Sequence, residues 1–232
     1  MNARDRLVVA LDVPSAEEAV VLVDRLAGLA GMFKVGSQLF TAGGPDLVRG
    51  LVARGEKVFL DLKYHDIPNT VAGAVSAACR LGVSLVDVHA LGGKAMMEAA
   101  VGAMPAMGTR LLAITVLTSH DPASFGDLGL AGDIADTVRR LALLAYAAEV
   151  DGVVASPPEV PIVREACGKD FLIVTPGIRP AGARASDQAR SATPAAALKA
   201  GADLLVVGRP VIEAPDPAAA ARAILHEMEG AA

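Results

Sequence analysis

Two acids and a lysine stand close together after a short apolar stretch in the middle of the chain. Asp61, Lys63 and Asp66 follow Val58-Phe59-Leu60 within six positions. Side chains alternate between the two faces of a strand, so Asp61 and Lys63 are expected to project the same way. Opposite charges at the end of a buried strand are costly unless they are paired or used. Taken alone, the spacing fits either a structural ion pair with Asp66 capping the next helix, or a catalytic group.

Further charged residues stand late in, or just after, the two preceding apolar runs. Asp12 ends Leu7-Val8-Val9-Ala10-Leu11, and Lys34 lies inside Phe33-Lys34-Val35-Gly36. Four charges from three consecutive strands favour a catalytic constellation of Asp12, Lys34, Asp61 and Lys63. Neighbouring carboxylates favour the charged form of a lysine, which makes it a good acid and a poor nucleophile. A substrate that sheds CO2 beside such carboxylates would also be relieved of repulsion.

A second polar cluster is typical of phosphate binding. Thr175-Pro176-Gly177-Ile178-Arg179-Pro180 and Val207-Gly208-Arg209-Pro210 follow the last two predicted strands. In parallel barrels these two loops commonly bind phosphate, and arginine supplies forked donors. Turn glycines with solvated arginines are the alternative, but two Gly/Arg pairs on the two expected loops favour phosphate. The long loop over 177–193 is a candidate lid; for Gln188 within it, spacing alone favours a solvated residue.

Apolar runs and helical patterns alternate along the whole chain. Such alternation predicts a parallel sheet, and eight units in 232 residues predict closure into a (β/α)8 TIM barrel forming a single domain over 1–232. A doubly wound open sheet is the structural alternative. The predicted strands are 7–11, 33–36, 58–60, 85–89, 110–117, 152–154, 171–174 and 203–207. The predicted helices begin near residues 15, 45, 68, 93, 133, 158, 194 and 217.

Composition narrows the class of protein. The net charge is −5 without a basic run, and aromatic residues are only 3% of the chain, so no nucleic-acid partner is expected. Cys79 and Cys167 are far apart and lack partners at metal-ligand spacing, which predicts neither a metal site nor a disulfide. No apolar run approaches the ~20 residues of a membrane span. We expect a cytoplasmic protein without membrane association.

Several of these motifs together resemble one enzyme family. They include Ala10-Leu11-Asp12, Lys34-Val35-Gly36, the ten residues from Asp61 to Thr70, and Val88-His89-Ala90. They continue with Leu117-Thr118-Ser119, Thr175-Pro176-Gly177-Ile178-Arg179-Pro180, Asp187-Gln188 and Val207-Gly208-Arg209-Pro210. The set is similar to orotidine 5′-phosphate decarboxylases of the bacterial type, and the resemblance covers nearly the whole chain.

The resemblance implies the last step of UMP synthesis, conversion of orotidine 5′-phosphate to UMP and CO2 without metal or organic cofactor. It implies that Lys63 protonates C6, that Asp61 lies beside the departing carboxylate, and that Lys34 and Asp12 hold the ribose hydroxyls. It also implies a homodimer in which Asp66 and Thr70 enter the neighbouring site. The implied substrate-binding residues are Asp12, Ile67, Thr70, Thr118, Arg179, Gln188, Gly208 and Arg209. The family raises Thr118 and Gln188 above what spacing alone supports.

Two other functions compete with this hypothesis. A metal-dependent sugar-phosphate decarboxylase of the keto-gulonate phosphate type shares Asp-x-Lys-x-x-Asp, but it needs an acid where this chain has Lys34. A non-catalytic phosphosugar-binding protein on the same fold is the other. Among the remaining polar residues, His65 and Asp87 are interpreted as structural, whereas His89 fits a pocket residue and a core residue equally well.

Overall fold

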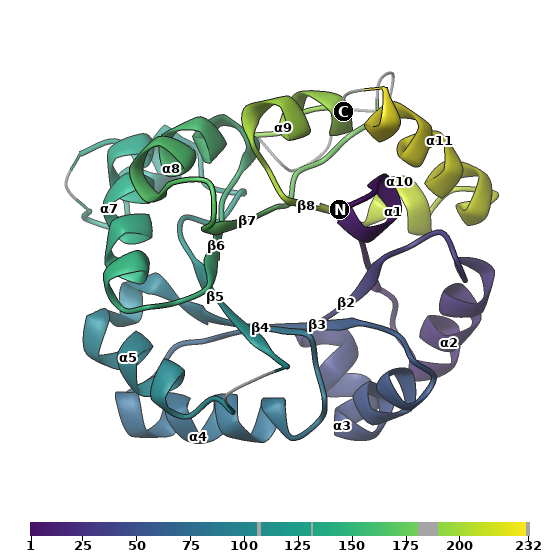
Figure 1. Ribbon diagram of the computed structural model, residues 1–232, viewed down its shortest axis with the longest axis horizontal. Helices are drawn as coiled ribbons and strands as arrows, with labels where there is room; N and C mark the ends of the chain where they lie inside the picture. Colours follow the sequence, from purple (N-terminus) through teal and green to yellow (C-terminus); the bar gives the residue numbers. More distant parts are fainter. Residues whose placement is uncertain (106–107, 131, 181–189, 231–232) are drawn as a thin grey trace.

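Eight parallel strands close into a barrel that helices surround, as Figure 1 shows for the computed structural model. The structure describes residues 1–105, 108–130, 132–180 and 190–230. Strand order around the barrel follows the chain, and β1 closes the ring by pairing with β8. This confirms the predicted TIM barrel. The strands are β1 Leu7–Ala10, β2 Met32–Gly36, β3 Val58–Tyr64, β4 Leu85–His89, β5 Arg110–Ile114, β6 Gly152–Val154, β7 Leu172–Thr175 and β8 Leu204–Val207.

Each strand is followed by helical structure on the outside of the barrel. The α-helices are α1 Ala3–Arg6, α2 Ala16–Arg25, α3 Ser37–Ala53, α4 Pro68–Cys79, α5 Lys94–Gly102, α6 Pro122–Gly126, α7 Ile134–Ala147, α8 Val160–Cys167, α9 Pro194–Ala200, α10 Arg209–Ile212 and α11 Pro217–Glu229. Two 3₁₀ turns, η1 Ala90–Gly92 and η2 Pro157–Glu159, precede α5 and α8. No described helix is both long and apolar enough to cross a membrane.

Three helical segments differ from the prediction. Helix α3 spans Ser37–Ala53, but Gly44 within it has φ 61° and ψ −170°, which is not helical, so two helical segments meet at a kink there. The predicted start at Pro45 is confirmed as the start of the second segment, whereas the first segment, from Ser37, was not predicted. Residues 122–126, expected as loop, form the short helix α6, which Asp121 and Ser124 stabilise through a reciprocal capping box. Helix α1 was not predicted; Arg6 at its end donates hydrogen bonds to the carbonyl oxygens of Ala202 and Asp203, just before β8.

Alternation along the strands builds both the core and the site. Inward-facing side chains fill the barrel with a small apolar cluster: Val8, Ala10, Met32, Phe59, Leu85, Leu112, Leu172, Val174, Leu204 and Val206. The outward-facing side chains pack against the helices in a larger core. Continuing the inward rows by two residues leads from Ala10 to Asp12, from Met32 to Lys34 and from Phe59 to Asp61. The charged residues are therefore the layer directly above the apolar filling of the barrel.

Strand β3 departs from regular alternation beside β4. Leu60 pairs with Val86 and Tyr64 pairs with Val88, so three residues of β3, Asp61 to Lys63, lie opposite one residue of β4. Within this bulge Lys63 has φ 51°, a left-handed conformation that is uncommon for a residue with a side chain. Asp61 and Lys63 do converge as predicted, but the bulge helps to bring them together, so simple alternation was an incomplete reason.

Candidate active site

A cavity of about 330 Å³ opens at the carboxyl ends of the strands, within the range of small-molecule sites. Its lining residues lie in, or shortly after, strands all around the barrel except β4. Eight of the residues singled out from the sequence line it: Asp12, Lys34, Asp61, Lys63, Thr118, Arg179, Gly208 and Arg209. The cavity mouth is thus where the strand-end argument placed the polar residues.

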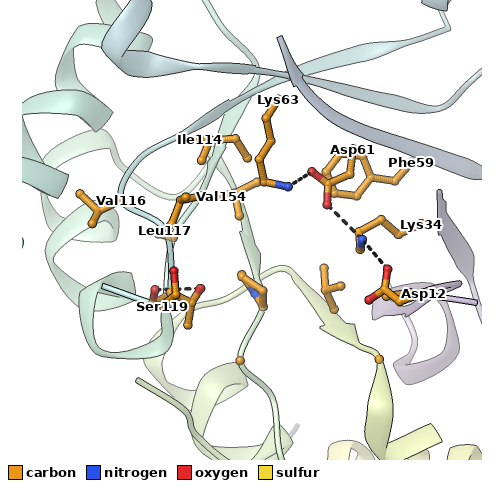
Figure 2. Close-up of a pocket in the computed structure, with 18 of the residues that line it drawn as sticks. Asp12, Lys34, Phe59, Asp61, Lys63, Ile114, Val116, Leu117, Ser119 and Val154 are labelled. Carbon is orange, nitrogen blue, oxygen red and sulfur yellow. Dashed lines mark hydrogen bonds and ion pairs between the residues drawn. The ribbon is translucent and has the colours of Figure 1, made fainter. Parts of the chain in front are cut away.

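Four charged side chains form a continuous row along one wall of the cavity, with alternating signs (Figure 2). The Nζ of Lys63 contacts Oδ1 of Asp61, whose Oδ2 lies 3.1 Å from Nζ of Lys34. Lys34 in turn lies 3.2 Å from Oδ1 of Asp12. The ammonium of Lys63 therefore points to an acid inside the cavity. Because the four side chains contact one another, they are not isolated surface charges.

Burial and charge act against each other in this row. Burial alone would lower the pKa of Lys34, but the carboxylates of Asp61 and Asp12 outweigh it and raise that pKa above its usual value. Burial would likewise raise the pKa of Asp61, yet Lys34, a hydrogen bond with Asp87 and Lys63 hold that pKa far below its ordinary range. Lys34 is therefore an ammonium and Asp61 a carboxylate near neutral pH. A carboxylate fixed between two cations is a group that can oppose a second negative charge brought beside it.

Glycine at position 36 leaves room for this arrangement. A side-chain carbon there would lie 3.1 Å from Nζ of Lys34 and 3.6 Å from Oδ1 of Asp12. Any larger residue would push the Lys34 ammonium away from its partners. The Lys-Val-Gly sequence of β2 thus provides a charge and the space for it.

The polar groups of the opposite wall belong to residues that follow β5, β6, β7 and β8. The hydroxyl of buried Ser156 donates to Oγ1 of Thr118 at 3.3 Å, so a pair of hydroxyls from two loops faces the cavity. Gly177 has φ 78°, and a side-chain carbon on it would lie 2.8 Å from the carbonyl oxygen of Arg190. Glycine is therefore required there for both backbone conformation and space.

The two ends of the 177–193 loop are fixed to each other. Arg179 N–H donates to the Ala192 carbonyl at 2.9 Å, and Ala192 N–H donates to the Gly177 carbonyl at 3.1 Å. Arg190 adds a longer link, because its guanidinium donates to Glu159 Oε1 at 2.7 Å and to the Leu117 carbonyl at 2.8 Å. Arg190 therefore ties one end of this loop to the segment that carries Thr118. Gln188 lies outside the described residues.

Three predicted residues do not line this cavity. Asp66 and Ile67 border a wide, open depression together with His65, Pro68, Leu91 and Gly92, and Thr70 is exposed one turn into α4. Asp66 accepts a hydrogen bond from the Ile67 N–H at 2.6 Å, whereas the N-cap position of α4 is Ile67 itself. Capping of α4 by Asp66 is thus not what the structure has.

His89 lines neither the cavity nor this depression. Its ring stacks on His65 with centroids 5.4 Å apart, and its Nδ1 accepts a hydrogen bond from Leu91 N–H. Burial, followed by the charges of His65 and Lys63, lowers the pKa of His89 to about 4. His89 is therefore neutral at physiological pH.

Reasoning from the sequence missed Ser156 and the ion pair of Glu159 with Arg190. Ser156 follows β6 by two residues, so the same strand-end rule that found Thr118 could have found it. Glu159 and Arg190 are 31 residues apart, and neither motif nor spacing signals their contact.

Comparison with known proteins identifies the family. The family model described as "Orotidine 5'-phosphate decarboxylase / HUMPS family" matches residues 5–224. The chain belongs to this family. A protein of Moorella thermoacetica named orotidine 5'-phosphate decarboxylase is 54% identical over 99% of this chain and 94% of its own length. One of Halorhodospira halophila with the same name is 58% identical over 97% of both chains.

A solved structure shares the fold of this family member at full length. The crystal structure of orotidine 5'-phosphate decarboxylase from Lactobacillus acidophilus superimposes with a TM-score of 0.84 and 40% sequence identity, covering 96% of this chain and 98% of the other. The family resemblance read from the motifs is thereby confirmed.

Proposed function

We propose that this protein decarboxylates orotidine 5′-phosphate to UMP in pyrimidine nucleotide synthesis. The observation that supports this best is the row Lys63–Asp61–Lys34–Asp12 at the cavity wall, with the ammonium of Lys63 at one end and the carboxylate of Asp61 fixed beside it. The family to which the chain belongs, and the names of its relatives, point the same way.

In the chemical step the bond between C6 and the carboxyl carbon breaks, and its electron pair stays at C6 while CO2 leaves. The Nζ of Lys63 then gives a proton to C6, and the resulting amine regains a proton from water. Asp61 disfavours a substrate carboxylate beside it and holds the ammonium of Lys63 in place. The ammonium also stabilises the negative charge that develops at C6.

The remaining lining residues bind the other parts of the substrate. Lys34 and Asp12 bind the ribose hydroxyls, and Thr118 binds the pyrimidine. Arg179, Gly208 and Arg209 bind the phosphate with Gln188, a role for Gln188 that rests on the family resemblance alone. Binding a distant phosphate tightly contributes to rate when that energy is used to hold the reacting ring against the charged wall.

A second subunit would complete the site. Asp66, Ile67 and Thr70 lie on an exposed surface away from their own cavity, and Ile67 is an exposed large apolar side chain. We propose that this surface meets a second copy of the chain, so that Asp66 and Thr70 of each subunit reach the other's substrate. We therefore propose a homodimer in which each subunit is a single barrel domain. We also propose that it acts in the cytoplasm.

The metal-dependent rival is less well supported. Its mechanism needs an acid on β2 to share a cation with the neighbouring carboxylates. Here the ammonium of Lys34 lies between Asp12 and Asp61, 3.2 and 3.1 Å from them, and it would repel a divalent cation.

The direct test is loss of absorbance from orotidine 5′-phosphate in the presence of EDTA, with UMP identified chromatographically. We expect full turnover in EDTA, and none from Lys63→Ala protein purified in parallel, which controls for a contaminating enzyme. Turnover of a keto-sugar phosphate that requires Mg²⁺, with none of orotidine 5′-phosphate, would support the rival. Tight binding of UMP with no turnover of either substrate would indicate a binding protein.

The shared site has its own test. Lys63→Ala and Asp66→Ala proteins are each expected to be inactive, and mixing them after dissociation should restore up to about a quarter of the wild-type activity per mole of sites. Half of the mixed molecules are heterodimers, and one of the two sites in each of them combines the intact Lys63 with the intact Asp66. Mixtures that stay inactive, although native mass spectrometry detects heterodimers, would contradict the shared site.

A further inference from the structure

Asp87, interpreted as structural from the sequence, is buried directly behind the charged row. Asp87 is 0% exposed, and it occupies the next inward position after Leu85 on β4. The bulge places it opposite the three residues from Asp61 to Lys63. A carboxyl group with no access to water must have its charge or its proton satisfied by its neighbours.

The two oxygens of Asp87 have different surroundings. Oδ1 accepts a hydrogen bond at 2.7 Å from the backbone N–H of Lys63, the residue with the left-handed backbone. Oδ2 is buried and accepts no hydrogen bond from any described residue. The Asp87 side chain also interacts with the side chain of Asp61, whose carboxylate can only accept.

A proton on Oδ2 resolves both observations. As a carboxylate, Asp87 would place a second negative charge against Asp61 from a position that is fully buried. As a carboxylic acid, it donates from Oδ2 to Asp61 and still accepts from Lys63 through Oδ1. Burial and the charge of Asp61 both raise the pKa of Asp87 well above its usual value, in agreement with this arrangement.

We propose that Asp87 is a neutral carboxylic acid that acts as a positioning residue, holding the Lys63 backbone in its left-handed bulge and orienting the Asp61 carboxylate by donating to it. It does not touch the substrate cavity. Through its two hydrogen bonds Asp87 fixes the backbone of Lys63 and the carboxylate of Asp61. These are the two residues beside which C6 of the substrate would react. This inference rests on the proposed function for its catalytic consequence, but the protonation of Asp87 does not depend on it.

Asparagine and valine separate the possible roles of Asp87. Asp87→Asn reproduces the neutral acid, because its amide oxygen can accept from Lys63 N–H and its NH₂ can donate to Asp61. Asp87→Val keeps a residue suited to a strand interior and removes both hydrogen bonds. We expect kcat of Asp87→Asn to stay within about threefold of wild type. We expect kcat of Asp87→Val to fall by roughly 100-fold, as for a small misplacement of reacting groups, with KM changed less than about threefold because the phosphate grip is distant.

Infrared difference spectroscopy on the wild-type protein at neutral pH tests the proton directly. Subtracting the spectrum of Asp87→Asn should reveal the C=O stretch of a protonated carboxyl group, which moves when aspartate is ¹³C-labelled. Asp46→Asn, a change of an exposed carboxylate on α3, should reveal only ionised carboxylate bands.

Three results would overturn the proposal. Loss of only ionised bands in Asp87→Asn would show that Asp87 carries a charge, and this readout remains available if Asp87→Val does not fold. Equal losses of kcat in the Asn and Val variants would show that a neutral hydrogen-bonding group is not sufficient. A kcat of Asp87→Val equal to that of wild type would show that Asp87 does not position Lys63 and Asp61 for the reaction. If the wild-type protein itself has no turnover of orotidine 5′-phosphate, the proposed function fails, whereas the infrared result still decides the proton.

Discussion

The two walls of the cavity hold their polar groups by different means. On the wall from β1 to β3, the groups are side chains of the strands or of the residue just after them, and they contact one another as ions. On the wall from β5 to β8, the groups follow the strands, and main-chain hydrogen bonds and the Arg190 guanidinium hold their loops. Side chains fixed to a barrel cannot follow a moving substrate, whereas loops can close around one.

This difference suggests a division of labour. The rigid wall suits a reaction in which charge must already be in place when the carboxyl group leaves, because reorganising it during the reaction would be costly. The loop wall suits recognition of the phosphate and the ring. Substitutions on the first wall should therefore mainly lower kcat, and substitutions on the second should mainly raise KM.

The largest effect is expected at the rigid wall. Lys63→Ala should lower kcat by about 10⁴-fold, the upper end of what one positioned acid contributes. Affinity for UMP, measured by calorimetry, should change less than about tenfold, since the proposed phosphate ligands are intact. Lys94→Ala is the matched control, because Lys94 is an exposed lysine paired with Glu98 on α5. Turnover retained in Lys63→Ala would refute the role of Lys63 as proton donor.

Substitutions on the loop wall should mainly raise KM. Arg209→Ala should raise KM by roughly 10- to 100-fold, the loss of about 1.5–3 kcal/mol of charge-assisted hydrogen bonding. Its kcat at saturation should fall much less than that of Lys63→Ala. Arg49→Ala, which removes an exposed arginine paired with Asp46 on α3, is the control. A fall in kcat with KM unchanged would show that the two walls are not functionally distinct.

The sequence predicted the rigid wall better than the loop wall, and the reason is geometric. Asp12, Lys34 and Asp61 could be placed because strand periodicity and the barrel rule fix where strand-end side chains meet. The bulge at Lys63 and the buried contact of Asp87 depend on backbone conformation, which residue types alone do not specify. The pairing of Glu159 with Arg190 depends on how two loops pack, and no local pattern records it. The segment of α3 that begins at Pro45 was predicted, whereas the segment from Ser37 to the kink at Gly44 was not.

An intermediate effect is expected where the loop wall is anchored. Among the described residues, Glu159→Ala leaves the Arg190 side chain bonded to the Leu117 carbonyl only, so the segment carrying Thr118 and the end of the 177–193 loop should be less ordered. Loss of about one hydrogen bond between charged groups predicts a rise in KM of roughly tenfold, with kcat little changed. Glu98→Ala, which removes an exposed ion pair on α5, is the control. An unchanged KM would show that the ion pair of Arg190 with Glu159 does not help to order the residues that line the cavity.

The smallest effect concerns β4, the strand between the two walls, whose last residue is His89. Because burial lowers the pKa of His89 to about 4 from an unfolded value of 6.5, the unfolded state binds more protons between these pH values. His89 therefore contributes stability above pH 6.5 that is lost as the pH falls toward 4, an effect of about 1 kcal/mol after allowance for its partial exposure. Urea denaturation at fixed protein concentration measures the free energy of unfolding at each pH. As the pH falls, this free energy should decrease less steeply in His89→Asn, which can still accept from Leu91 N–H, than in wild type. The control His226→Gln, on the exposed face of α11, should show the wild-type decrease. Equal slopes in wild type and His89→Asn would mean that His89 titrates as it does in the unfolded chain and that its burial does not keep it neutral.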